Sequence, residues 1–511
     1  MNRALLAAFV APALWSAPSL ASVVIYGGPT YDQATGTGYL YPPLGPDPIA
    51  VVGNGTAAYT AQKYIEGMDV GRRALRWDAT GASATELETF GAASEAWAMN
   101  PAGTVVGRAE KHADGASLGF RAVRWAATGT AVIELSNLGT NKSGFTECLA
   151  LAVNAAGTAV GFADKYTGDV RHGERAVRWD AGGAAATELG NLGASGTYTR
   201  SMAFDINGAG TVVGFANKFL NGLDRGERAV RWDAGSTVAI ELGHIGTDSR
   251  GFTRCRAKAV NAAGTAVGDA DKYINDAYRG SRAVRWNAAG TAVTELANLG
   301  TRSDGYTSCS SLSVNAAGTT AGYANKYSGD AFCGYRAVRW DADGVVITEL
   351  GNFGTSDTGY ASNGALAINA AGIAVGTSER YIDGKNLGRR AVAWGLDGAP
   401  RDLNMLLSAS DAVQWLLVHA YGISDTNWVT GWGTFDPDVD GPLPPYIRAF
   451  LLQLPYCDAA DFDGSGYITG IDFDQYVFAF EAGAASADID GDGNVTGMDF
   501  DAFVVAFEAG C

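Results

Sequence analysis

The stretch VNAAGTAVG at residues 153–161 decides the fold of this chain, because the chain uses it repeatedly. The same nine letters stand at 260–268, and VNAAGTTAG stands at 314–322. In each copy a short apolar segment leads to Asn, and Gly follows three residues later. Asn at the first place and Gly at the last place of a four-residue turn indicate a type I turn closed by a residue with positive φ. The stretch therefore predicts a recurring β-hairpin.

The hairpin belongs to a longer unit marked by Arg-Ala-Val-Arg-Trp and close variants. The marker's Trp recurs at steps of 48 to 54 residues, at positions 77, 125, 179, 232, 286, 340 and 394, and an eighth copy is reduced to Tyr-Ile-Arg-Ala-Phe at 446–450. Within 150–193 the unit divides into four strand-like pieces, ALAVN, TAVGFAD, RAVRW and TELGNLG. Four antiparallel strands in a unit of about 54 residues, repeated eight times, predict a mainly β chain with an eight-bladed β-propeller.

The number of strands of each kind predicts how the ring closes. Second and third strands number eight each, whereas only the seven Trp markers are followed by a fourth strand. The segment VVIYGGPT at 23–30 looks like a copy of the fourth piece. We therefore expect the N-terminal segment to supply the missing strand of the last blade, which would cover an exposed edge. An open β-solenoid is the alternative, and it would not need this segment.

Two late stretches carry a family resemblance. RDLNMLLSASDAVQWLLVHAYGISDTNWVTGWG at 401–433 and RAFLLQLP at 448–455 resemble the end of bacterial extracellular HAF-repeat proteins. The resemblance covers roughly residues 23–455, although this chain has Arg-Ala-Val-Arg-Trp where that family more often has His-Ala-Phe-Leu-Trp. It implies secretion and a propeller-like fold, and it implies no settled activity.

The first residues have the layout of a secretory signal peptide. Arg3 precedes an apolar run from Ala4 to Trp15, and Ser-Leu-Ala ends at Ala21. A short membrane anchor is the alternative, but the run is shorter than the roughly 18 residues that a span requires. We expect a signal peptide at 1–21, a propeller at 22–455 and a separate module at 456–511. The protein is then secreted, extracellular or held on the outer cell surface.

The negative charge is concentrated at the end of the chain. The formal net charge is −17, and residues 457–511 hold twelve acids and no Lys or Arg, which leaves −17 minus −12, or −5, for the rest. Neither part carries the basic stripe of a nucleic-acid-binding protein. The tail instead predicts cation binding.

Two twelve-residue segments of the tail fit calcium loops, DFDGSGYITGID at 461–472 and DIDGDGNVTGMD at 488–499. Such loops place oxygen ligands at positions 1, 3, 5, 9 and 12, use the backbone carbonyl of position 7, and turn at Gly in position 6. A solvated acidic turn is the alternative, and the second copy of the pattern argues against it. Two Ca²⁺ ions are therefore expected, with ligands from Asp461, Asp463, Ser465, Tyr467, Thr469 and Asp472 in the first loop and from Asp488, Asp490, Asp492, Asn494, Thr496 and Asp499 in the second.

Each loop precedes a segment with helical spacing of aromatic residues, FDQYVFAFEAG at 473–483 and FDAFVVAFEAG at 500–510. Two loop–helix units with Asp at position 12 resemble the dockerin modules of secreted polysaccharide-degrading systems, over residues 457–511. The resemblance implies a cohesin-like protein partner, and attachment to the cell surface is the alternative. Cys457 and Cys511 flank the module, and we expect them to form a disulfide.

The propeller's recurring side chains favour structural roles. The aromatics before the first strand and near the end of the second are candidates for stacking on sugars or peptides, but their recurrence favours packing: Tyr166, Phe219, Tyr273, Tyr327, Tyr381, Phe145, Phe252, Tyr306 and Tyr360. These segments, such as KYTGDVRHGE at 165–174, are expected to be long loops on one face of the ring. One repeated Glu is expected to pair with the recurrent Arg, at Glu86, Glu134, Glu188, Glu241, Glu295 and Glu349.

The remaining cysteines suggest disulfides, as expected for an exported protein. Cys309 and Cys333 are predicted to lie at one end of a blade, so a Cys309–Cys333 bond is preferred and a Cys255–Cys309 bond is the alternative. Cys148 holds the same repeat position as Cys255 and Cys309.

Two functions remain open from the sequence. The first is a secreted, non-catalytic binding or structural protein, whose propeller presents a ligand-binding face and whose calcium module attaches it. The alternative is a carbohydrate-active enzyme, a glycoside hydrolase or lyase carried by the dockerin-like module. The sequence shows no nucleophile elbow, phosphate loop or one-off acid pair, so no catalytic residue is predicted. A polysaccharide ligand is compatible with both.

Overall fold

The computed structural model describes residues 25–28, 30–41, 50–77, 84–288, 290–439, 441–454, 460–462, 470–489 and 494–509. The chain divides into two units, Val23–Pro455 and a second one that holds Tyr456–Cys511. The expected signal peptide and the Cys457–Cys511 bond lie outside the described residues. Each unit is considered by itself below.

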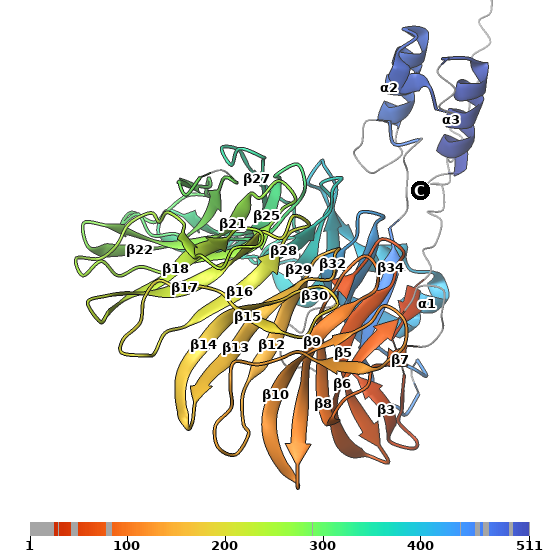
Figure 1. Ribbon diagram of the computed structural model, residues 1–511. Helices are drawn as coiled ribbons and strands as arrows, with labels where there is room; N and C mark the ends of the chain where they lie inside the picture. The colour runs from red at the N-terminus through yellow and green to blue at the C-terminus, as the bar shows by residue number, and fades with distance from the viewer. Residues whose placement is uncertain are drawn as a thin grey trace, which may run out of the picture. The chain divides into compact units, whose positions relative to one another are not determined.

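The larger unit is built from antiparallel sheets of four hydrogen-bonded strands, and the sheet of the first blade has six. Figure 1 shows the blades following one another along the colour scale, from β5 and β6 through β13 and β14 to β21 and β22. The first strands are β4 (Ala50–Val51), β8 (Gly91–Met99), β12 (Cys148–Val153), β16 (Ser201–Ile206), β20 (Cys255–Val260), β24 (Cys309–Val314), β28 (Asn363–Ile368) and β32 (Trp415–Ile423). The second strands are β5 (Ala57–Ile65), β9 (Val105–Ala113), β13 (Ala159–Thr167), β17 (Val212–Leu220), β21 (Ala266–Ile274), β25 (Thr320–Ser328), β29 (Ala374–Ile382) and β33 (Trp428–Phe435).

The third strands end at the marker Trp in seven blades. They are β6 (Met68–Trp77), β10 (Ala116–Trp125), β14 (Val170–Trp179), β18 (Leu223–Trp232), β22 (Ala277–Trp286), β26 (Ala331–Trp340), β30 (Lys385–Trp394) and β34 (Tyr446–Gln453). The short fourth strands are β7 (Thr85–Glu86), β11 (Val132–Glu134), β15 (Ala186–Glu188), β19 (Ile240–Glu241), β23 (Val293–Glu295), β27 (Ile347–Glu349), β31 (Pro400–Asp402) and β1 (Ile25–Gly27). A hairpin of β2 (Tyr31–Asp32) and β3 (Thr37–Leu40) adds to the first blade, and a 3₁₀ turn η1 (Leu403–Leu406) and a helix α1 (Ala409–Gln414) precede β32.

The N-terminal strand completes the last blade, as the strand count predicts. The sheet order is β1-β34-β33-β32, and β1 runs antiparallel to β34 with Tyr26 opposite Leu451. Eight hydrophobic clusters then join consecutive blades, and one of them packs Trp77 and Tyr59 of the first blade against Leu451 of the last. These contacts close a ring of eight blades and exclude the open solenoid.

The opening stretch VNAAGTAVG is explained by this geometry. Gly157 has φ +90°, and its N–H donates to the Asn154 carbonyl over 2.9 Å, which closes the predicted turn. Gly161 lies opposite a β-bulge in the first strand, where a Cβ would collide with the Leu149 carbonyl oxygen. The two glycines are therefore required for different reasons, one for its backbone conformation and one for a close approach of two strands.

The Asn of each turn also links its blade to the next one. Asn154 Oδ1 accepts from the Thr158 N–H over 3.0 Å, and Asn154 Nδ2 donates to the Asn207 carbonyl over 3.1 Å. The same link runs from blade to blade at the buried residues Asn100, Asn154, Asn207, Asn261, Asn315 and Asn369, and Asn369 donates to the Ser424 carbonyl because the last blade has Ser in place of the Asn. Across the closing junction, Thr426 donates to the Gly53 carbonyl instead.

The marker Trp holds the outer part of each junction. Six of these side chains are at most 1% exposed, and each Nε1 donates over 2.7–3.0 Å to a carbonyl of the preceding blade, at Trp125, Trp179, Trp232, Trp286, Trp340 and Trp394. A buried indole needs such a partner, because an unpaired N–H in the core costs about 1–3 kcal/mol.

The smaller unit contains α2 (Gly470–Glu481), a 3₁₀ turn η2 (Ala485–Ala487) and α3 (Gly497–Ala509). The two predicted helices therefore form, and each begins three residues before its expected start. Tyr476 of α2 stacks on Phe503 of α3 with ring centroids 3.8 Å apart and planes 7° apart. These rings form a small aromatic core between the helices.

Replacing the linking Asn of one blade tests how far the ring depends on it. Asn261→Ala removes an amide that donates to the Asn315 carbonyl and accepts from the Thr265 N–H. We expect the free energy of unfolding to fall by about 2 kcal/mol, because buried polar groups lose their partners. Denaturant titration measures the change, and Asn191→Ala, at an exposed Asn, is the control. Equal effects of the two variants would contradict a structural role of the link.

Removing residues 22–30 from the chain tests ring closure. The last blade would lose its outer strand, so we expect a large drop in melting temperature. Ile25→Asp is a milder change at the same strand, because it leaves the strand in place and alters one side chain that packs against the core between the last two blades. We expect this variant to lower the free energy of unfolding by about 2 kcal/mol or more. The exposed Thr30→Asp is its control. Unchanged melting of the truncated chain would show that β1 is dispensable.

Candidate functional site

The recurring Glu is a structural residue, as its repetition predicts. In the third blade, Glu188 forms an ion pair with Lys165 over 2.6 Å and a second one with Arg175 over 3.3 Å. The same triple recurs in five further blades, at Glu86, Glu134, Glu241, Glu295 and Glu349. The expected Arg partner is confirmed. The Lys partner was not predicted, although it also recurs in the sequence, immediately before an aromatic residue in most blades.

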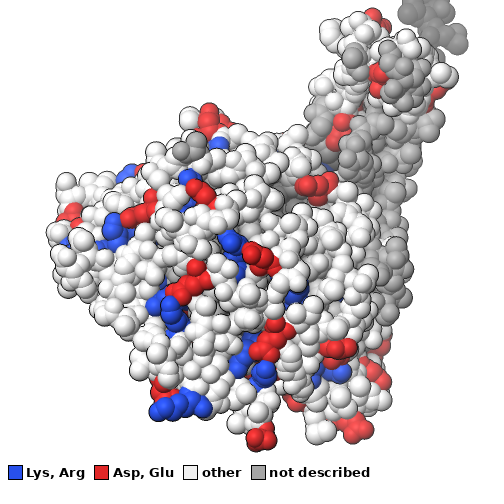
Figure 2. All heavy atoms as spheres, in the orientation of Figure 1, with Lys and Arg blue, Asp and Glu red and all other residues white. Residues whose placement is uncertain are grey.

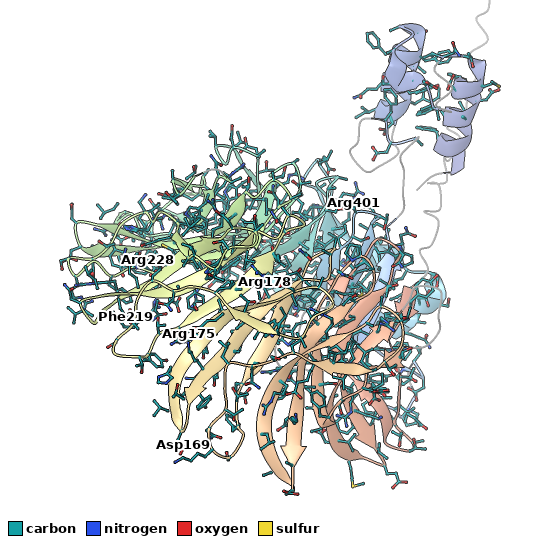
Figure 3. The ribbon with its side chains drawn as sticks, viewed as in Figure 1. Asp169, Arg175, Arg178, Phe219, Arg228 and Arg401 are labelled. Carbon is teal, nitrogen blue, oxygen red and sulfur yellow. The ribbon has the colours of Figure 1, made fainter. Side chains whose placement is uncertain are left out.

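The same Arg reaches the following blade. Arg228 donates to the carbonyls of Thr253 and Gly251, each over 2.8 Å, in the segment that leads to the next first strand. In Figure 3, Arg175 and Arg178 lie successively farther along β14 from the turn at Asp169. On the face drawn in Figure 2, acidic and basic side chains lie next to one another in small groups. Recurring charges are thus used to join blades, and they do not form a catalytic pair.

Functional residues are better sought where one blade departs from the others. Glu95 on β8 is such a case, with a side chain that is 4% exposed. It pairs with Arg72 of the first blade over 3.1 Å and with Arg108 of its own blade over 2.7 Å. Burial by itself would raise the pKa of Glu95, but the bonds to Arg108 and the charge of Arg72 outweigh burial and lower the pKa. Glu95 therefore fastens the first junction as a carboxylate.

Glu147 is a second acid without a counterpart, since the same place in later blades holds Arg200, Arg254, Ser308 and Ser362. Its pKa is raised by burial and by the charge of Asp164. Asp164 itself is held by Arg171 through two bonds of 2.6 and 2.7 Å. One carboxyl group with a raised pKa thus stands near an ion-paired one.

Five of the nine aromatic candidates lie on strands and not on long loops. The segment expected to be a long connection, 165–174, consists of the ends of β13 and β14 joined by the two-residue turn Gly168–Asp169. Tyr166, Phe219, Tyr273, Tyr327 and Tyr381 are therefore strand residues, each opposite a residue near the start of the third strand. The prediction of long loops fails here because strand pairing continues through polar residues. The other four candidates lie outside the strands, in the connections between the fourth strand of one blade and the first strand of the next: Phe145, Phe252, Tyr306 and Tyr360.

The predicted Cys309–Cys333 disulfide is wrong. Cys148, Cys255, Cys309 and Cys333 are all free and buried. Cys309 begins β24 and Cys333 lies on β26, with β25 between them, and two strands separated by a third are about 9.5 Å apart. A disulfide requires Cα atoms within about 7 Å. The alternative Cys255–Cys309 bond is absent too, because these residues pack into different blade junctions. Burial raises the pKa of the Cys255 thiol to about 12.

The calcium loops are only partly described. Asp461, Asp472, Asp488, Asn494, Thr496 and Asp499 lie within the described residues, and Asp463, Ser465, Tyr467, Thr469, Asp490 and Asp492 lie outside them. Asp472 and Asp499, at position 12 of each loop, are fully buried carboxyl groups in the first turns of α2 and α3. Asp499 accepts from the Ile489 N–H over 2.8 Å and from the Thr496 N–H over 2.7 Å.

This arrangement fits a calcium ion. Asp499 thus hydrogen-bonds both the second and the ninth position of its loop. A carboxylate buried without a cation is costly, and oxygen ligands at these spacings are those that Ca²⁺ takes. Tyr476 and Phe503 of the aromatic core are fully buried.

One face of α2 exposes apolar side chains. Phe478 is 76% exposed and Ile471 is 59% exposed, and they border an open groove of about 490 Å³ with Asp474 and Gln475. Among the described residues no helix is long and apolar enough to cross a bilayer.

Comparison with known proteins leaves the activity open. Residues 149–330 match the family described as "Protein of unknown function (DUF3466)", and no curated protein matches the chain. Among solved structures, the β-propeller domain of the Trilobed protease from Pyrococcus furiosus has 10% identity and a TM-score of 0.41, over 73% of this chain and 97% of that one. Puromycin hydrolase has 12% identity and a TM-score of 0.42, over 82% of this chain and 63% of that one. TolB from Acinetobacter baumannii has 11% identity and a TM-score of 0.30, over 57% and 62%.

Glu95→Gln should weaken the ring and change its response to acid. The variant leaves Arg72 and Arg108 without their buried carboxylate. We therefore expect the free energy of unfolding at neutral pH to fall by about 3 kcal/mol. The folded state lowers the pKa of Glu95 below its ordinary value of 4.5. The stability that ionised Glu95 contributes is therefore fully present above pH 4.5. It is lost as the pH falls through the lower pKa that Glu95 has in the folded state.

Thermal melts of both proteins between pH 7 and pH 3 measure this difference. The gap in melting temperature should narrow as the pH falls below 4.5. Glu88→Gln, at an exposed acid of the same region, is the control. A gap that stays constant with pH would contradict the assignment of an ionised Glu95.

Proposed function

We propose that this protein is a secreted, non-catalytic binding or structural protein. Its propeller is a rigid ring that presents a ligand-binding face, and its C-terminal module is a dockerin-like, calcium-stabilised attachment device. The observation that carries the proposal is the use of the recurring acids, each held in its own blade by Lys and Arg. A catalytic acid pair needs two carboxyl groups in different environments, whereas these are equivalent and ion-paired.

The calcium part of the proposal rests on the two loops. Asp472 and Asp499 are buried at the same position of each loop, and each stands at the start of a helix. Together with the other ten predicted ligands, they would hold two Ca²⁺ ions. Bound calcium would neutralise the carboxylates and join each loop to its helix, and much of the module's stability would come from the metal. The exposed groove at Phe478 supports contact with a protein partner or a surface component.

One observation favours the alternative, a carbohydrate-active enzyme. Glu147 has a raised pKa next to the Arg-bound Asp164, and its repeat position holds other residue types elsewhere. An acid of this kind is suited to donate a proton to a leaving group.

One experiment separates the two functions. The chain without residues 1–21 is incubated with calcium and with insoluble polysaccharides or isolated cell envelopes. Depletion of the protein and release of reducing ends are measured in the same tubes. We expect depletion without release. Release of reducing ends that disappears in Glu147→Gln would establish the enzyme instead.

Chelation of calcium should unfold the C-terminal module alone. With EGTA we expect the helical circular-dichroism signal and the near-ultraviolet signal of the Tyr476–Phe503 stack to disappear, while the β signal remains. Added Ca²⁺ should restore both, and Mg²⁺ at the same concentration is the control because it rarely fills such loops. Asp499→Asn should require more Ca²⁺ for the same recovery. Loss of the β signal together with the helices would contradict two independent units.

A further inference from the structure

One position near the start of the third strand separates two blades from the others. Five blades hold a charged or polar residue there, at Asp69, Ser117, Arg171, Asp224 and Asn386. Blades five and six instead hold Tyr278 and Phe332, which are 46% and 42% exposed. Side chains needed for the fold recur in every blade, so these two aromatic residues are not explained by the repeat. Large exposed aromatic groups are also a common mark of a binding surface.

Each of the two residues is the centre of an aromatic triad. In blade five, the ring of Tyr278 lies 5.6 Å from that of Tyr273 and 6.2 Å from that of Tyr306. In blade six, the ring of Phe332 lies 5.7 Å from that of Tyr327 and 6.1 Å from that of Tyr360. The interplanar angles also agree, 54° and 71° against 53° and 72°. The same triad is thus built twice, in adjacent blades.

The second triad continues along its blade. Tyr335 is 42% exposed, and its ring lies 5.3 Å from Phe332 and 5.8 Å from Tyr323. Tyr335 also departs from the repeat, because Ser281 and Glu227 hold its position in the two preceding blades. The exposed aromatic rings of blade six therefore continue from Phe332 to Tyr335 along the third strand.

The charged groups next to the triads have partners within the protein, and the Asp271 carboxylate accepts a hydrogen bond from the Tyr278 hydroxyl. Arg302 forms an ion pair with Asp304 over 2.9 Å and lies 5.5 Å from the centre of the Tyr306 ring. Arg279 donates to the Asp304 carbonyl over 2.6 Å. Asn325 donates to the Tyr327 hydroxyl over 3.1 Å. A surface of rings, hydroxyl groups and neutralised charges is complementary to an uncharged ligand that is itself amphipathic.

We propose that the two triads bind a neutral polysaccharide. The C–H face of a pyranose ring packs on an aromatic ring, and its hydroxyl groups bond to Tyr O–H and Asn groups at the edge. Two equal sites in adjacent blades suit a ligand whose own units repeat, so a polymer is favoured over a single small molecule. The inference rests on the proposed binding function and names its ligand class and its site.

The chain supplies its own test substitution. Blade seven holds Asn386 at this position, where its amide donates to the Tyr381 hydroxyl over 3.2 Å. Tyr278→Asn and Phe332→Asn therefore place in blades five and six a residue that the repeat accommodates. The matched control is Val170→Asn with Leu223→Asn, which removes two apolar side chains of 58% and 59% exposure near the same place of blades three and four. Phe332→Tyr is the conservative variant.

Binding is measured by depletion of the full chain, without residues 1–21 and with calcium, on cellulose, xylan, chitin, starch and β-1,3-glucan. For the polysaccharide that the wild type binds, we expect the double variant to raise Kd about tenfold or more, because both stacking centres are lost. The control pair and Phe332→Tyr should keep the wild-type Kd, and all melting temperatures should agree.

The outcomes separate this inference from the proposed function. If the double variant binds as the wild type does, the triads are not the site, while the protein remains a binding protein. If the wild type binds cell envelopes but none of the five polysaccharides, the ligand class is wrong and the binding function stands. Binding to neither overturns both.

Discussion

Six of the eight blade junctions of this protein are bridged by the side chain of one buried Asn. The amide closes the hairpin of its own blade with its oxygen and reaches the carbonyl of the neighbouring Asn with its nitrogen. A four-stranded sheet has two faces to bury and cannot cover both by itself, so the blades are stable only as neighbours. The ring must therefore close, and it closes where the N-terminal strand pairs with the last blade. The marker Trp and the Arg of the Lys–Glu–Arg triple form further hydrogen bonds across the junctions.

This use of the repeat decides where function is to be sought. A side chain that occurs in every blade is accounted for by the junctions, whatever its chemistry. The aromatic residues Tyr278 and Phe332 and the acids Glu95 and Glu147 occur once or twice, at positions where other blades hold different residue types. Glu95 is explained by its buried carboxylate, which pairs with one Arg from each of two adjacent blades. The exposed aromatic pair has no such role, and it is the stronger mark of a ligand site.

The C-terminal module follows a different physical rule. Its helices share one small aromatic core, with Tyr476 stacked on Phe503, and its acids are gathered in the loops before each helix. The buried position-12 carboxylates, Asp472 and Asp499, favour a bound cation over free solvated loops. With the proposed Ca²⁺ ions bound, the module would gain stability from its metal, and its proposed attachment function and its folding would depend on the same ions.

The sequence alone predicted the hairpin, the number of blades, the strand that closes the ring, the pairing of Glu with Arg and the two terminal helices. These features depend on turn residues and on spacing within one unit, and the repeat makes each pattern visible several times. Only the tertiary structure decided that 165–174 is strand, that Cys309 and Cys333 are two strands apart, and that Asn154 donates to Asn207. The triads around Tyr278 and Phe332 were missed for the same reason, although a comparison of the third strands would have marked both residues. Contacts between blades join residues of different repeat units, and their distances are set by strand pairing and ring closure, which no local pattern contains.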